Sequence, residues 1–153
     1  MNLTENLKDI LRAFNAHSVQ YLIVGAHALG VHAEPRATKD LDLFIRSDAQ
    51  NADAVFKALA EFGAPLTGLT SADFADGTTF QIGQPPERID ILQAIDGVAF
   101  DEAWSNRVEG EIDQIPACII SREDMIRNKI ASGRLQDLAD VEILRAAERA
   151  TRK

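Results

Sequence analysis

The sequence predicts an α/β (α+β) fold, and three observations favour it. The apolar segment VQYLIVG ends in a glycine and is followed at once by AHALGVH, which is the order strand, glycine, helix. In LDLFI and RIDILQ, apolar residues alternate with polar ones, as on a strand with one buried face. Near the start of the chain, TENLKDILRAFNAH repeats its apolar residues at helical spacing.

In the first half of the chain, capping residues set the limits of each element. A helix is expected from Thr4, a suitable N-cap, to about His17. Residues 19–25 should form a strand that ends at Gly25, and a short helix should follow over 26–32. Residues 41–45 should form a second strand. The segment 47–63 should be a helix that Ser47 or Asp48 caps and Gly63 ends.

The second half begins with residues 64–76, which are rich in Gly, Pro, Ser and Thr and are expected to form a loop. Residues 77–83 and 88–93 should pair as a hairpin through the turn QPPE, because proline cannot continue a strand ladder. A helical turn at 100–106 and short β-like pieces within 107–120 come next. Ser121 should start a helix that runs through Ile130, and after Gly133 a last helix should reach about Ala150.

Composition excludes several classes of protein. The chain has 153 residues with a formal net charge of −8, which disfavours a general nucleic-acid coat protein, although a local basic patch near REDMIRNKIASGR stays open. No apolar run approaches the roughly 18–20 residues that span a bilayer, and the start MNLTENLKD has no signal-peptide character, so we expect no membrane association and a cytoplasmic location. The single cysteine, Cys118, is interpreted as a buried small apolar residue.

Two aspartates stand one residue apart in KDLDLFIR. Residues i and i+2 of a strand share a face, so the carboxylates of Asp40 and Asp42 must point the same way. Taken alone, such a pair is typical of the solvent side of an edge strand. However, Gly25 lets the backbone approach a ligand, and the helix that follows aims its free N–H groups at the same place, as in a phosphate-binding turn. Asp90, in RIDIL, alternates with isoleucines on a strand expected to neighbour that of Asp40 and Asp42.

Three carboxylates on one patch repel one another, and a divalent cation relieves that repulsion. Mg²⁺ takes oxygen ligands and characteristically shares one or two protein carboxylates with substrate phosphates. Two ions about 3.5–4 Å apart would steady the attacking and leaving oxygens of a displacement at phosphorus. The acidic residues and the phosphate-binding turn together indicate chemistry on a nucleotide.

This set of residues resembles the polymerase-beta-like nucleotidyltransferase superfamily. Its pattern is apolar–Gly–(Gly or Ser), a spacer, acidic–apolar–acidic–apolar, and a third acidic residue on a later strand. The segments VGAHALGVHAEPRATKDLDLFI and RIDIL carry it, with residues 27–39 as the spacer. PRATKDLDLFI is similar to the small bacterial single-domain branch related to abortive-infection (AbiEii-like) toxin nucleotidyltransferases. One residue departs from the pattern: Ala26 stands where the family has Gly or Ser, so a hydroxyl contact to phosphate is missing while the backbone N–H remains.

The resemblance implies a nucleotidyltransferase fold: a small mixed β-sheet with helices packed mainly on one side, and a C-terminal helical pair. The single domain 1–153 would comprise a catalytic core over 1–120 and C-terminal helices over 121–150. The resemblance also implies that the catalytic residues and metal ligands are Asp40, Asp42 and Asp90. Nucleotide binding would involve Gly25, Ala26, Lys129, Asp137 and Asp140, the last three from MIRNKIASGRLQDLADVEIL.

Several further residues have two interpretations. Arg36, Thr38 and Lys39 precede the acidic strand and would contact a triphosphate or belong to a surface loop. His27 would approach a phosphate or pack in the interior. Trp104 would belong to the core or cover the cleft. Lys129 would reach phosphates or be an ordinary surface lysine.

The expected reaction is Mg²⁺-dependent transfer of a nucleoside monophosphate from an NTP to a hydroxyl of an RNA end, a protein or a small molecule. A role in a toxin–antitoxin or phage-defence system, with a cognate toxin or antitoxin as partner, is a further expectation of the branch. The alternative is a degenerate, non-catalytic regulator that binds a nucleotide or a partner, and Ala26 is the residue that favours it.

Overall fold

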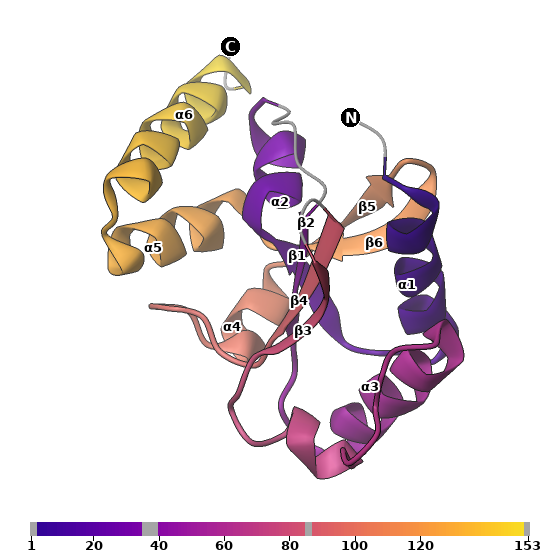
Figure 1. The fold of residues 1–153 in the computed structure, drawn as a ribbon. Helices are drawn as coiled ribbons and strands as arrows, with labels where there is room; N and C mark the ends of the chain where they lie inside the picture. The colour runs from indigo at the N-terminus through magenta and orange to yellow at the C-terminus, as the bar shows by residue number, and fades with distance from the viewer. Residues whose placement is uncertain (1–2, 35–39, 85–86, 152–153) are drawn as a thin grey trace.

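The chain is a mixture of helices and short strands, as the sequence predicts (Figure 1). The structure is a computed structural model that describes residues 3–34, 40–84 and 87–151. The elements are α1 (Glu5–Ala16), β1 (Tyr21–Val24), α2 (Gly25–His32), β2 (Asp40–Ile45), α3 (Ala49–Phe62), the 3-10 helix η1 (Ser71–Phe74), β3 (Phe80–Gln84), β4 (Glu87–Leu92), α4 (Phe100–Ser105), β5 (Val108–Ile112), β6 (Ile115–Ile119), α5 (Arg122–Ser132) and α6 (Leu135–Thr151).

Six strands of the described residues form one mixed sheet in the order β3-β4-β2-β1-β6-β5. The central strand β2 runs antiparallel to β1 and parallel to β4, and β1 runs parallel to β6. The antiparallel pairs β3–β4 and β5–β6 occupy the two edges. The predicted hairpin over 77–93 is therefore confirmed, although Pro85 and Pro86 of its turn lie outside the described residues.

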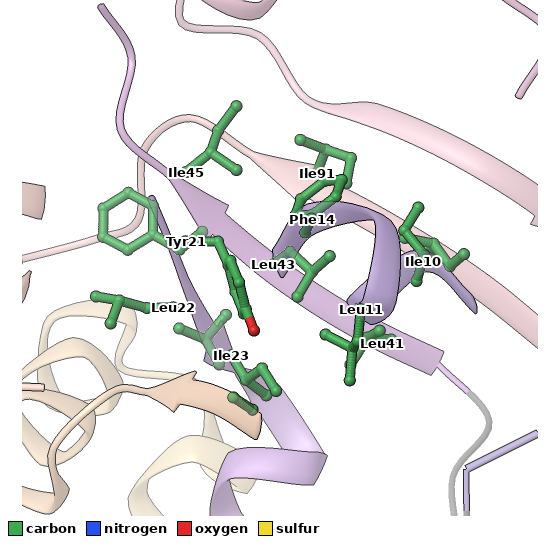
Figure 2. Packing of buried hydrophobic residues seen from close by; sticks show 14 of the residues in the cluster. Ile10, Leu11, Phe14, Tyr21, Leu22, Ile23, Leu41, Leu43, Ile45 and Ile91 are labelled. Carbon is green, nitrogen blue, oxygen red and sulfur yellow. The ribbon is translucent and has the colours of Figure 1, made fainter. Parts of the chain in front are cut away.

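One face of the sheet packs against α1 and α3. The alternation in β2 turns Leu41 and Leu43 toward this face, where both are fully buried. Figure 2 shows Phe14 of α1 close to Leu43, and Ile10 of the same helix belongs to the same hydrophobic cluster. Burying a side chain of this size completely contributes about 1.5–3 kcal/mol, so this layer is the main source of stability.

The opposite face of β2 is apolar at one end and polar at the other. Phe44 meets the ring of Phe100 in α4 at 5.1 Å between centroids. Asp40 and Asp42 share this face at the start of the strand, away from that contact. Their end of the sheet is the one from which α2 leaves β1.

The C-terminal helices form the predicted pair. Ser121 caps α5 by accepting from the backbone N–H of Asp124 at 3.1 Å, and Gly133 ends the helix in the left-handed conformation with φ +69°. The strands lie between this pair and the helices α1 and α3 in Figure 1. Within the described residues, no helix is both long enough and apolar enough to cross a membrane.

The structure corrects three details of the prediction. Gly25 is the first residue of α2, and α5 continues past Ile130 to Ser132. The predicted loop 64–76 contains the 3-10 helix η1. The reason is a capping box between Thr70 and Asp73, together with the full burial of Phe74 between aromatic rings.

Candidate active site

The acidic residues gather on β2 and β4. In the parallel register of these strands, Asp42 stands opposite Asp90 and Asp40 stands opposite Arg88. The intervening residues, Leu41 and Ile89, are buried in the core, so all four polar side chains share the other face. We refer to Asp40, Asp42 and Asp90 as the acidic face. The prediction that Asp40 and Asp42 lie on one face beside a neighbouring strand with Asp90 is confirmed.

Gly25 lies directly against Asp42. The antiparallel pairing of β1 and β2 sets Val24 opposite Asp42, and Gly25 turns the chain into α2 with φ +72°. A Cβ atom at this position would collide with a carboxylate oxygen of Asp42. The N-cap residue Val24 has no side chain that can cap α2, so the described N-cap leaves the first N–H groups of the helix without a side-chain acceptor. The turn from β1 into α2 thus presents N–H donors next to a carboxylate.

Arg88 is a residue of the site that the sequence reasoning missed. Its Nε lies 3.1 Å from Oδ1 of Asp90, its Nη2 donates to Oδ2 of Asp90 at 3.3 Å, and the same Nη2 is 4.0 Å from Oδ2 of Asp40. The signal was present in RIDIL, because a residue two positions before Asp90 must share its face.

The pKa of Asp42 is raised to about 6, and burial is the largest cause. The negative charge of Asp90, a hydrogen bond with its carboxyl group and the charge of Asp40 also act to raise this pKa, whereas Arg88 acts to lower it. The charged form of Asp42 is therefore disfavoured by its surroundings, and a nearby positive charge would stabilise it.

A cleft of about 280 Å³ connects the acidic face to the C-terminal helices. Gly25 and Asp42 line one side, and Lys129, Arg134 and Asp137 line the other. The sequence-predicted residues Gly25, Asp42, Lys129 and Asp137 therefore meet around one cavity. Asp40, Asp90 and Asp140 are not among its lining residues.

Lys129 is held by carboxylates of α6. Its Nζ donates to Oδ2 of Asp140 at 2.9 Å and lies 3.6 Å from Oδ1 of Asp137. Arg134, a second residue that the sequence reasoning missed, donates from Nε to Oδ2 of Asp137 at 2.7 Å. Asp140 is 1% exposed and does not line the cleft, so it lies behind Lys129, which does.

The remaining candidate residues that the structure describes do not lie together at the cleft. Arg36, Thr38 and Lys39 lie outside the described residues. His27 is buried, and burial lowers its pKa, although the charge of Asp40 opposes that shift. Trp104 stacks on Phe100 and carries the guanidinium of Arg107 at 4.0 Å, which matches the packing interpretation, and it does not line the cleft. Cys118 is partly buried and packs against the core.

Two of the carboxylates have the chemistry of magnesium ligands. Among the residues that the structure describes, no group of three or more His, Cys, Asp or Glu side chains is gathered to hold a metal ion. Asp42 and Asp90 nevertheless offer adjacent oxygen donors, and Oδ1 of Asp90 is buried without a hydrogen-bond partner. This donor set fits Mg²⁺, which binds through one or two carboxylates and completes its shell with water and phosphate oxygens.

Solved structures of other proteins share this fold. A lincosamide antibiotic adenylyltransferase, LnuA, bound to lincomycin, aligns with a TM-score of 0.58 at 18% identity over 96% of this chain and 99% of that one. ANT(2'')-Ia in complex with adenylyl-2''-tobramycin aligns with a TM-score of 0.57 at 18% identity over 96% and 97% of the two chains. A putative nucleotidyltransferase from Thermotoga maritima gives 0.55 at 15% identity over 92% and 88%. At these identities the likeness establishes the mixed α/β fold.

Comparison with curated proteins finds no match. A family model described as "Nucleotidyltransferase of unknown function" (DUF6036) matches residues 1–148. That match includes the turn at Gly25, the acidic face, Lys129 on α5 and the aspartates of α6 that contact Lys129. The chain belongs to this family of nucleotidyltransferases.

Proposed function

We propose that this protein transfers a nucleoside monophosphate from an NTP to a hydroxyl group of a small-molecule acceptor. One observation carries the proposal: the β1–β2 pairing places the uncapped start of α2 against Asp42, in a cleft that Lys129 closes from the other side. A metal-bound triphosphate requires N–H groups that donate hydrogen bonds to phosphate and carboxylates that bind the metal, close to one another.

Each residue then has a role. The N–H groups at Gly25 and Ala26 would bind phosphate oxygens, and Lys129 would balance their charge from α5. Asp40, Asp42 and Asp90 would hold Mg²⁺, which supplies positive charge at the reacting phosphate when it is bound; two ions are expected in the active complex. Additional triphosphate contacts from Arg36, Thr38 and Lys39 stay a prediction.

The proposed reaction is a displacement at the α-phosphorus of the NTP. The acceptor oxygen attacks the α-phosphorus of the NTP, the bond from that phosphorus to the bridging oxygen of the β-phosphate breaks, and pyrophosphate leaves. The proton of the acceptor hydroxyl passes to Asp90, whose Oδ1 has no hydrogen-bond partner within the described chain.

The size of the molecule favours a small acceptor over an RNA end or a protein. The chain spans almost the full length of LnuA and ANT(2'')-Ia, and those structures contain lincomycin and adenylyl-2''-tobramycin. In addition, the net charge of −8 opposes binding of a long polyanion. The toxin–antitoxin role expected from the resemblance, with its partner protein, has no such support and stays a prediction.

The experiment incubates the purified protein with Mg²⁺, each α-labelled NTP and a panel of hydroxyl-bearing small molecules, including lincosamides and aminoglycosides. Transfer of label to an acceptor, with equimolar release of pyrophosphate, is the expected result. Asp42→Asn should abolish transfer, whereas Asp53→Asn, a change of the same type on the exposed face of α3, should not.

Two other outcomes are informative. Transfer of label only to RNA or protein would show that the acceptor class is wrong. Tight NTP binding with no pyrophosphate released in the presence of any acceptor would favour the non-catalytic alternative, for which Ala26 is the motivating residue.

A further inference from the structure

We propose that Arg88 is an internal counter-ion of the acidic face that competes with the divalent cation and lets it bind firmly only together with the nucleotide. This inference rests on the proposed function, because it concerns the metal that the acidic face would hold.

The first step is geometric. Asp42 and Asp90 stand directly opposite each other on adjacent strands, which brings like charges together. The guanidinium of Arg88 lies on the same face and contacts both oxygens of Asp90, at 3.1 and 3.3 Å, while reaching to 4.0 Å from Asp40. It therefore lies among the carboxylates that a metal ion would use.

The second step concerns the quality of this contact. Nε of Arg88 and Oδ1 of Asp90 are both buried, and although they are 3.1 Å apart neither makes a hydrogen bond within the described part of the chain. The pair is thus attracted by charge without the aligned geometry of a strong bidentate bond. An arginine held in this way supplies positive charge to the face, but a better cation can displace it.

The third step is the competition itself. A divalent ion and the guanidinium of Arg88 compete for the same carboxylates, because each raises the cost of binding the other by charge repulsion. Metal alone must therefore displace Arg88. Metal with a nucleotide brings phosphate oxygens, which give the displaced guanidinium a new anionic partner. The Arg88 side chain is 32% exposed, which leaves it room to move.

The test measures Mn²⁺ binding without nucleotide, by electron paramagnetic resonance of the free ion, in the wild type and in Arg88→Gln. R88Q should bind Mn²⁺ about five- to tenfold more tightly. Its metal-free form should melt at a lower temperature than the wild type and should show a larger rise in melting temperature with Mn²⁺. Arg12→Gln is the matched control: it removes one charge from an arginine paired with Asp9 at 3.0 Å on α1, away from the acidic face, and should leave Mn²⁺ affinity unchanged.

A second measurement uses the wild type, so it does not depend on the folding of a variant. The Nε–H proton of Arg88 should exchange more rapidly with solvent after addition of Mg²⁺ and a non-hydrolysable ATP analogue. Equal or weaker Mn²⁺ affinity in R88Q, or unchanged exchange at Arg88, would overturn the inference even if the wild type transfers nucleotides. Tighter Mn²⁺ binding in R88Q, combined with no nucleotide transfer by the wild type, would leave the inference intact and contradict the proposed function.

Discussion

At the scale of single residues, Asp42 and Gly25 constrain each other. Asp42 carries a carboxylate in a buried, negatively charged setting, which costs stability. Gly25 has no side chain because the space that a Cβ atom would need belongs to that carboxylate. A chain selected only for stability would have no reason to keep this arrangement, which is the pattern expected where residues serve a binding site at a cost in stability.

Asp42→Asn should raise the stability of the metal-free protein. Removing a charge whose burial raises its pKa to about 6 relieves repulsion by Asp90, and we expect a gain of about 1 kcal/mol in the free energy of unfolding at pH 8. Urea denaturation measures this change. The same variant should lose Mg²⁺–nucleotide binding by calorimetry. A variant that is less stable than the wild type and binds nucleotide normally would mean that Asp42 has a structural role only.

Gly25→Ala should destabilise the protein and weaken nucleotide binding together. Its methyl group meets Asp42, and a non-glycine residue at φ +72° adds backbone strain, for a total of about 2–4 kcal/mol. Gly68→Ala is the control for the strain alone, since Gly68 has φ +81° and nothing within 4 Å of an added Cβ. Equal losses of stability in the two variants would show that the contact with Asp42 is unimportant.

At the scale of elements, α5 and α6 are joined through buried charges as well as apolar contacts. Lys129 is 12% exposed, and Asp137 and Asp140 are 8% and 2% exposed in their side chains. The ammonium group neutralises two carboxylates that would otherwise be buried with unbalanced charge. Lys129 therefore both lines the cleft and holds α5 and α6 together.

Lys129→Met should weaken the docking of α6 onto α5. Removal of one member of a buried ion pair costs about 3 kcal/mol, because the partners stay buried without compensation. Lys57→Met, at an exposed pair with Asp53 on α3, should change stability by less than about 0.5 kcal/mol. Denaturation gives both free energies, and hydrogen exchange should show faster opening of α6 only in K129M. Wild-type protection of α6 in that variant would contradict this account.

At the scale of the whole molecule, the start of the chain and its later strands are interlocked. β1 lies between β2 and β6, and His32 at the end of α2 hydrogen-bonds through Nε2 to the carbonyl oxygen of Ile120, just past β6, at 2.6 Å. Burial lowers the pKa of His32, and the charge of Arg122 adds to this, while the bond to Ile120 opposes it.

The contribution of His32 to the free energy of unfolding should therefore fall as the pH drops below about 6.5. In the unfolded chain His32 takes up a proton there, whereas the folded protein resists it down to its lowered pKa, so this residue favours unfolding in that window. Above that window the contribution of His32 should be complete. Thermal unfolding of His32→Gln, which retains a donor for Ile120 but does not titrate, should depend less on pH between 7 and 5. An identical slope in both proteins would rule out His32 as a source of the acid sensitivity.

The sequence by itself determined the features that depend on a few neighbouring residues. Helix starts and ends follow from side chains that satisfy nearby backbone groups, such as the cap at Ser121 and the left-handed glycine at Gly133. The common face of Asp40 and Asp42 follows from the period of a strand. These are short-range geometric facts, so they could be predicted before any packing was known.

Tertiary structure alone decided the contacts between distant segments. The strand register sets Asp42 opposite Asp90 and places Arg88 between Asp90 and Asp40. The docking of α5 brings Lys129 and Arg134 to the cleft. Both depend on how the whole sheet and its helices pack. For the same reason Asp140 lies behind Lys129 instead of facing the cleft, although its spacing from Asp137 on α6 gave no sign of that difference. Two side chains on the same face of a helix can be buried to different depths. Only the neighbours that pack against the helix determine which of them reaches the cleft.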